Sequence, residues 1–148
     1  MQCEVRNVKI HKKLSEETTC FTATLYIDGQ KAADVSNRGN GGCHLYHWFN
    51  HELETPFKEY AKSLPPIQCE LGPLAMDMDG YVDELVIDWD ENKTVKRHCK
   101  TSTVFRLKTD PKGSWRTIKV PFNQTIKEQI VTKYPDLDTI ANELYLKQ

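Results

Sequence analysis

The sequence predicts an α+β fold in which a mainly antiparallel sheet, formed by an N-terminal β-meander and a C-terminal hairpin, packs against about four helices. Three observations carry this prediction. Apolar residues of period two fill the first third of the chain, two stretches of helical period follow, and a second pair of short strands comes after them. Strands and helices therefore occur in blocks, which is typical of α+β proteins rather than of singly alternating α/β proteins.

The N-terminal meander is predicted from strands at 3–14, 21–27 and 31–36. The second strand is the clearest, because four apolar residues alternate with threonines and a tyrosine along it. Asp28-Gly29 follows it directly, and this residue pair suits a type I′ hairpin turn. The meander is therefore expected to be antiparallel from its beginning.

A glycine-rich loop at 37–42 leads to a short fourth strand predicted at 43–49. The loop lacks the Gly-Lys-Ser/Thr ending of a P-loop, and it has no third glycine to complete GxGxxG. We interpret it as a turn that tolerates positive φ rather than as a phosphate-binding loop.

Two amphipathic helices follow the meander. The first is predicted over 51–64, with a regular part that starts at Pro56 after a Thr55 cap, and Pro65-Pro66 ends it. Residues 67–80 read as irregular chain. The second helix is expected to be capped by Asp79, and its apolar residues recur at i, i+3, i+4 and i+7: Val82, Leu85, Val86 and Trp89.

The C-terminal third predicts a hairpin and two more helices. Its strands are expected at 103–108 and 114–120. Asn123 is the predicted cap of a helix that ends at Pro135, and Asp136 is the predicted cap of a final helix. Because no linker or internal repeat divides these elements, we expect one domain over 1–148.

Composition excludes several classes of protein. No apolar run approaches the roughly 20 residues that a membrane span needs, and the N-terminus lacks the apolar core of a signal peptide. The five cysteines are odd in number, scattered, and without a CxxC pair, so we interpret them as reduced thiols. The expected location is the cytoplasm, which for a phage-encoded protein is that of the host, with no membrane partner.

Charge is strongly divided along the chain, although the net charge is −1. From Glu52 to Glu91 eleven acids stand against two lysines, and from Lys93 to Lys133 eleven bases stand against two acids. Such asymmetry can mark a surface that binds polyanions, and it can equally reflect two mutually attracting halves or a solvated face. The second helix contributes without any function, because its acids come first and its bases last, as the macrodipole favours.

The first candidate site is the C-terminal hairpin. If Arg106 pairs with Thr117 and Lys108 with Trp115, one surface of the hairpin faces water and carries the expected binding residues. These are Arg106, Lys108, Trp115 and Lys119. An aromatic ring among cations can stack a base and hold its phosphate, and the cations also attract an acidic protein. The alternative is a solvated face with a cation over the indole ring.

The second candidate site is a Cys/His cluster, for which the candidate metal ligands are Cys43, His44, His47 and His51. On a helix, His47 and His51 would be one turn apart and could share a zinc ion. A strand would instead place Cys43 and His47 on one face and His44 on the other. Neither zinc-finger spacing nor HExxH is present, so no cofactor is expected apart from a zinc ion at this cluster. A cysteine nucleophile with a histidine base, or histidine-driven phosphodiester hydrolysis, is the corresponding catalytic hypothesis.

Three segments carry a resemblance. Residues 7–10 with 14–19, Gly41-Gly42-Cys43 with Tyr46-His47, and 103–108 with 113–117 resemble small uncharacterised proteins of phages and bacterial mobile elements, and the match would cover most of the chain. The resemblance implies no activity and no functional residue. It implies a context, in which small phage proteins bind and block a host or defence component.

From the sequence we expect a non-enzymatic, phage-type accessory binding protein that acts through the basic aromatic hairpin. The expected role is inhibition of a bacterial defence component, and the expected partner is a host or defence protein, or else a nucleic acid or nucleotide. The alternative is a small metal-dependent nuclease or phosphodiesterase that uses the Cys/His cluster. A third possibility is a self-assembling protein in which acidic and basic halves of neighbouring copies meet.

Overall fold

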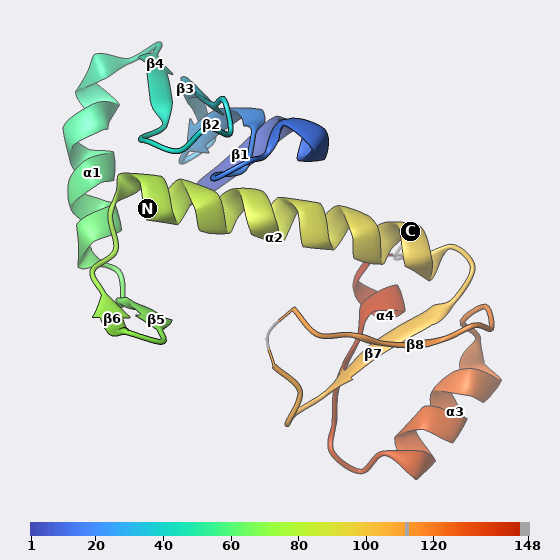
Figure 1. Cartoon of the computed structure of the whole chain (residues 1–148). Helices are drawn as coiled ribbons and strands as arrows, with labels where there is room; N and C mark the ends of the chain where they lie inside the picture. Colours follow the sequence, from blue (N-terminus) through green and yellow to red (C-terminus); the bar gives the residue numbers. More distant parts are fainter. Residues whose placement is uncertain (112, 146–148) are drawn as a thin grey trace. The chain divides into compact units, whose positions relative to one another are not determined.

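The computed structural model describes residues 1–111 and 113–145. The chain forms two compact units, Met1–Trp89 and Asp90–Gln148, which we call the N-terminal unit and the C-terminal unit. Helix α2, Met78–Cys99, begins in the first and ends in the second (Figure 1). The predicted α+β class with antiparallel sheets is confirmed, whereas the single domain stays a prediction. No helix within the described residues has the length and hydrophobicity to cross a membrane.

A four-stranded antiparallel sheet forms the N-terminal unit, in the order β1-β2-β3-β4. Its strands are β1 (Cys3–Ile10), β2 (Phe21–Ile27), β3 (Gln30–Asn37) and β4 (Leu45–Trp48). The turn between β2 and β3 has φ of 49° at Asp28 and 81° at Gly29. Both values are positive, as a type I′ turn requires, so the predicted hairpin is confirmed. The predicted first strand ends early, because residues Lys12–Leu14 form the 3-10 turn η1.

A β-bulge at Asn7 changes which residues of β1 face the core. Val5 and Val8 are both buried, although an odd spacing would place them on opposite faces of a regular strand. The register against β2 shifts between Arg6 and Lys9, and Asn7 has a φ of 53° in the left-handed region. The extra residue restores the inward position at Val8, and it turns Asn7 and Lys9 toward the other face of the sheet.

One face of this sheet is covered by helices and forms the core of the N-terminal unit. Helix α1 (Glu54–Ser63) contributes Phe57, and the first half of α2 contributes Val82 and Val86. They pack against inward residues of the sheet such as Leu25 and Val35, all nearly inaccessible to solvent. The pattern is the expected burial of alternate strand residues beneath amphipathic helices.

Local structure differs from prediction at two further places in this unit. A 3-10 turn, η2 (His51–Leu53), precedes α1, which begins at Glu54, so Thr55 is not its cap. The segment predicted as irregular contains a short hairpin of β5 (Ile67–Cys69) and β6 (Gly72–Leu74). A pattern of three residues per strand is too short for periodicity to reveal.

The N-terminal cap of α2 is Asp77 rather than Asp79. The Gly80 N–H donates to Asp77 Oδ1 at 2.7 Å, which is the bond expected of a capping carboxylate. Asp79 instead accepts from the His44 N–H at 3.0 Å and from the Tyr46 hydroxyl at 2.7 Å. The predicted cap therefore joins the helix to β4, a contact that sequence spacing does not show.

The C-terminal unit is a three-stranded antiparallel sheet in the order β8-β7-β9. Its elements are β7 (Thr103–Leu107), β8 (Arg116–Ile118), α3 (Gln124–Lys133), β9 (Leu137–Ile140) and α4 (Ala141–Tyr145). Asn123 caps α3 as predicted, since its Oδ1 accepts from the Ile126 N–H at 2.9 Å. The helix predicted from Asp136 is wrong over 137–140, because these residues pair with β7 as β9.

Strand β7 is covered on both faces. Phe105 and Leu107 pack with residues of α3 and β9 on one side. Val104 packs with Val95 and Cys99 of α2 and with Ala141 of α4 on the other. The small sheet is therefore the middle of three layers, with α3 on one side and the end of α2 and α4 on the other.

Candidate functional site

The predicted pairing of the basic hairpin is wrong by two residues. Val104, not Arg106, lies opposite Thr117, and Phe105 lies opposite Arg116. The strands end earlier than predicted, because Asp110 accepts from the Leu107 N–H at 3.1 Å and from the guanidinium of Arg116. A shift of two residues preserves the face on which each side chain lies.

Arg106 and Trp115 therefore still meet. The guanidinium carbon of Arg106 lies 4.9 Å from the centroid of the Trp115 ring, within the range of a cation–π contact. The same guanidinium pairs with Asp138, with Nη2 and Oδ2 at 3.1 Å. Trp115 also packs against the cluster around Val104. Of the four predicted surface residues, Arg106 and Trp115 are therefore only partly exposed, and Val104 on the same face of β7 is buried.

Lys108 and Lys119 are the exposed members of the predicted binding set. Within residues 1–111 and 113–145, neither has an acidic side chain at ion-pair distance. Arg116 differs, because it holds Asp110 in a bidentate contact. That hydrogen bond, together with the one from the Leu107 N–H, lowers the pKa of Asp110. The two lysines are therefore cations whose charge the described part of the fold leaves available.

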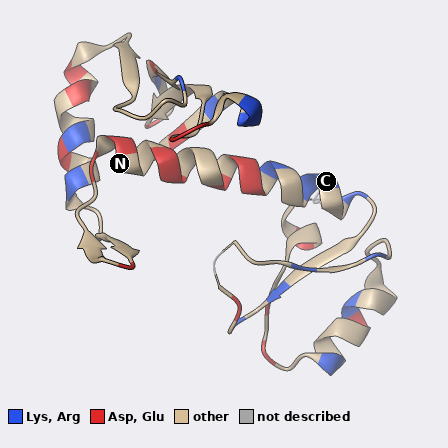
Figure 2. Ribbon diagram, in the orientation of Figure 1, with Lys and Arg blue, Asp and Glu red and all other residues tan. Residues whose placement is uncertain are grey.

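Helix α2 reproduces the division of charge that the sequence shows. Its first turns carry acids such as Asp79 and Asp83, and its last turn carries Lys96 and Arg97 (Figure 2). This order matches the helix macrodipole. Part of the asymmetry is therefore a property of one helix and does not by itself point to a partner.

The structure does not bring the Cys/His cluster together. His44 is buried before β4, whereas His47 is exposed on β4 and lies edge-on to Phe49 with ring centroids 5.5 Å apart. These two histidines face opposite sides of the sheet, as the strand alternative predicted. Cys43 is exposed and His51 lies in η2. Among the described residues, no group of three or more His, Cys, Asp or Glu could hold a metal ion.

His44 instead joins the glycine-rich loop to α2. Its Nε2 donates to Asp83 Oδ1 at 2.7 Å, and its Nδ1 accepts from Asn37 Nδ2 at 3.0 Å, a tautomer assigned from these partners. Asn37 Oδ1 in turn accepts from the Gly39 N–H at 2.8 Å. Burial lowers the pKa of His44, but the hydrogen bond and charge of Asp83 raise it by more, so the net shift is upward.

In this network the His44 ring is enclosed by its hydrogen-bond partners. The His44 side chain is 5% exposed, and both ring nitrogens are occupied, so a substrate proton has no access to them. Next to it, burial and the hydrogen bond to Asp79 raise the pKa of Tyr46. The two aspartates thus hold β4 and its preceding loop against the helix.

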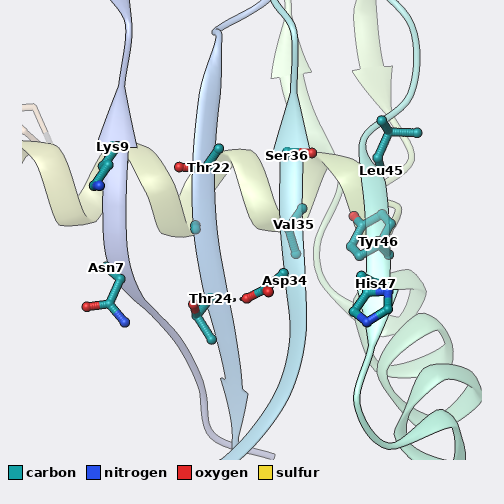
Figure 3. A pocket seen from close by; sticks show the side chains of 11 residues that line it. Asn7, Lys9, Thr22, Thr24, Asp34, Val35, Ser36, Leu45, Tyr46 and His47 are labelled. Atoms are coloured by element: carbon teal, nitrogen blue, oxygen red, sulfur yellow. Dashed lines mark hydrogen bonds between the residues drawn. The ribbon is translucent and has the colours of Figure 1, made fainter.

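The face of the N-terminal sheet opposite the helices contains a cavity of about 480 Å³. It is lined by polar side chains from all four strands, among them Lys9, Asp34 and His47 (Figure 3). The sequence analysis assigned no site to Lys9 or Asp34, and it considered His47 only as a candidate metal ligand. The sequence signal that could have revealed the cavity is the chemistry of the outward-facing strand residues, which include hydroxyls, an amide, a lysine and an aspartate.

Comparisons with known proteins identify no relative: no family model, no curated protein and no solved structure matches the chain.

Proposed function

We propose that this chain is a non-catalytic binding protein whose C-terminal unit holds an acidic protein partner. The binding surface is the basic hairpin, defined by Arg106, Lys108, Trp115 and Lys119. The observation that supports this proposal is the pair of exposed lysines, which lack an acidic partner among the described residues. Unpaired surface cations accelerate encounter with an acidic surface and help to select it.

The geometry favours an acidic protein over a base of nucleic acid. A base would need an open aromatic face on which to stack. The Arg106 guanidinium lies over the Trp115 ring, and the ring also packs against the buried cluster around Val104. Trp115 thus acts as a support for Arg106, and cations remain as the recognising groups.

The resemblance to small proteins of phages and mobile elements supports a proposal for the identity of the partner. On that basis the acidic partner is a host protein, with a component of a bacterial defence system as the form we propose. Binding would block that component without any chemical step.

A charge-reversal experiment tests the hairpin. The double variant K108E/K119E is compared with K12E/K13E, which makes the same change of charge at exposed lysines of η1 in the N-terminal unit. Binding is measured by fluorescence anisotropy with a labelled glutamate-rich peptide and a labelled single-stranded oligonucleotide. Capture from nuclease-treated bacterial lysate then identifies natural partners.

The proposal expects K108E/K119E to weaken binding of the acidic peptide by about tenfold or more, the equivalent of about 1.4 kcal/mol. K12E/K13E should leave it nearly unchanged. Equal losses in both double variants would mean that net charge alone matters, and the hairpin would be rejected as the site. Preferential binding of the oligonucleotide would replace the acidic protein with nucleic acid as the partner.

A further inference from the structure

The open face of the N-terminal sheet carries polar side chains in two rows that cross the strands. Direct pairing aligns the first row, because Lys9 lies opposite Thr22, Thr22 opposite Ser36, and Ser36 opposite Leu45. Figure 3 shows these side chains side by side across the four strands, and they line the cavity of about 480 Å³. That volume lies in the range of small-molecule sites.

The second row runs parallel to the first. Thr24 lies opposite Asp34, and Asp34 lies opposite His47. Arg6 of β1 lies opposite Thr24 and pairs with Glu4, and Asn7 of the bulge also lines the cavity (Figure 3). Bulges of this kind commonly re-aim side chains beside functional sites.

The bulge is what places the cation in the cavity. If residues 5–9 formed a regular strand without the bulge, Lys9 would share the inward face of Val5. The bulge puts a non-glycine residue in the left-handed region, a conformation that costs of order 1 kcal/mol and persists only where the surroundings hold it. Among the described residues that line the cavity, Lys9 is the lysine, and its position depends on a locally unfavourable backbone.

The two rows offer different chemistry. Lys9 is exposed, has no ion-pair partner among the residues described, and lies in line with the hydroxyls of Thr22 and Ser36. A cation with two hydroxyl donors suits a phosphate group.

In the second row Asp34 is the main hydrogen-bond acceptor. It accepts one hydrogen bond, from Thr24 Oγ1 at 3.2 Å, and an ionised carboxylate has room for about four. It can therefore accept from amino groups of a ligand, while the exposed His47 ring supplies a surface for stacking.

We propose that this face binds a nucleoside monophosphate whose base carries an amino group. The phosphate lies on the row of Lys9, and the amino group of the base donates to Asp34. Two strand spacings across the sheet and two residues along it place the Cα atoms of Lys9 and Asp34 about 12 Å apart, a span comparable to that of an extended mononucleotide between the side chains. A polyanionic strand is disfavoured, because its next phosphate would lie over Asp34.

This site and the basic hairpin use different residues in different units, so either proposal can fail alone. Binding is measured by titrating the isotope-labelled full chain and following its amide NMR signals. The probes are adenosine monophosphate, uridine monophosphate, whose base has no amino group, and inorganic phosphate. The expected shifts are confined to β1–β4, with adenosine monophosphate binding more tightly than uridine monophosphate.

Three variants separate the contributions. K9A should weaken the binding of adenosine monophosphate by about tenfold or more, because a hydrogen bond between charged groups is lost. K31A is the matched control, because Lys31 is an exposed lysine of the same sheet that lies over the Phe49 ring and does not line the cavity. D34N should weaken the binding of adenosine monophosphate and strengthen that of inorganic phosphate, because it removes the charge that repels phosphate and replaces one of the two acceptor oxygens with a donating NH2 group.

The proposal is overturned if millimolar adenosine monophosphate leaves the signals of β1–β4 unchanged, or if K31A weakens binding as much as K9A. It is also overturned if D34N strengthens the binding of adenosine monophosphate and of inorganic phosphate alike, because Asp34 would then act only as a repelling charge.

Discussion

Replacement of Asn142 by alanine should destabilise the C-terminal unit more than any surface change in it. Asn142 is 1% exposed and joins three parts of the unit. Its Oδ1 accepts from the Val104 N–H at 2.8 Å, and its Nδ2 donates to the carbonyl oxygens of Cys99 at 3.2 Å and Ser102 at 2.8 Å. One amide thus ties the end of α2, the connection to β7 and β7 itself to α4.

The size of the effect follows from these three bonds. A buried donor or acceptor left without a partner costs about 1–3 kcal/mol, and an ordinary hydrogen bond contributes about 1 kcal/mol net. The N142A variant leaves the Val104 N–H and two carbonyl groups unpaired, so we expect a loss of about 3–5 kcal/mol in the free energy of unfolding. N142D should cost at least as much at neutral pH, because it keeps the acceptor but places a carboxylate against two carbonyl oxygens.

Hydrogen exchange of the β7 amides measures the opening of this unit separately from that of the N-terminal unit. The control is N123A, which removes the cap of α3 and should cost about 1 kcal/mol. The deficit of N142D should also shrink as pH falls and its carboxyl becomes protonated. A loss below about 1 kcal/mol for N142A, or one equal to that of N123A, would refute the reasoning, because the three bonds would then contribute little.

Three further outcomes are expected. G39A should lower the free energy of unfolding by about 2 kcal/mol or more, because an added Cβ at φ +87° meets a backbone carbonyl oxygen. G29A, which has open space around the added Cβ, should lower it by about 1 kcal/mol, and denaturant titrations compare the two variants. H44Q should reduce stability more at pH 6 than at pH 8.5, because a histidine with a raised pKa stabilises the fold below its unfolded pKa of about 6.5 and loses that effect as pH rises through its folded pKa. Denaturant titrations at both pH values measure the loss, and an equal loss at the two would contradict this expectation. Cys99, which is buried and has a pKa raised by burial, should react with iodoacetamide far more slowly than the exposed Cys43, as peptide mass mapping would report; equal rates would contradict the burial.

Sequence reasoning located the elements better than their surroundings. The alternation in β2 and the positive-φ turn after it predicted the meander, and the cap at Asn123 was predicted from one residue. The strand at Leu137–Ile140 was missed, because four residues with a plausible cap also suit a helix, and only pairing with β7 decides between them. The hairpin register was missed by two residues because Asp110 and Arg116 set the length of the turn.

The candidate sites divide in the same way. The sequence identified Lys108 and Lys119 as cations but did not reveal that the Trp115 ring is half-buried under Arg106. It identified the histidines but not that His44 is enclosed by Asp83 and Asn37. The cavity on the open face of the N-terminal sheet was not predicted at all.

What the sequence by itself determined is the α+β class, the meander and the cap at Asn123, because periodicity, turn conformation and capping act between residues close together in the chain. Tertiary structure alone decided which face of each sheet is covered, and it decided that Asp79 contacts β4 instead of capping α2. It also decided that the bulge at Asn7 turns Lys9 outward. These outcomes depend on pairing and burial between residues far apart in the chain, and the sequence pattern around any one of them is compatible with more than one such partner.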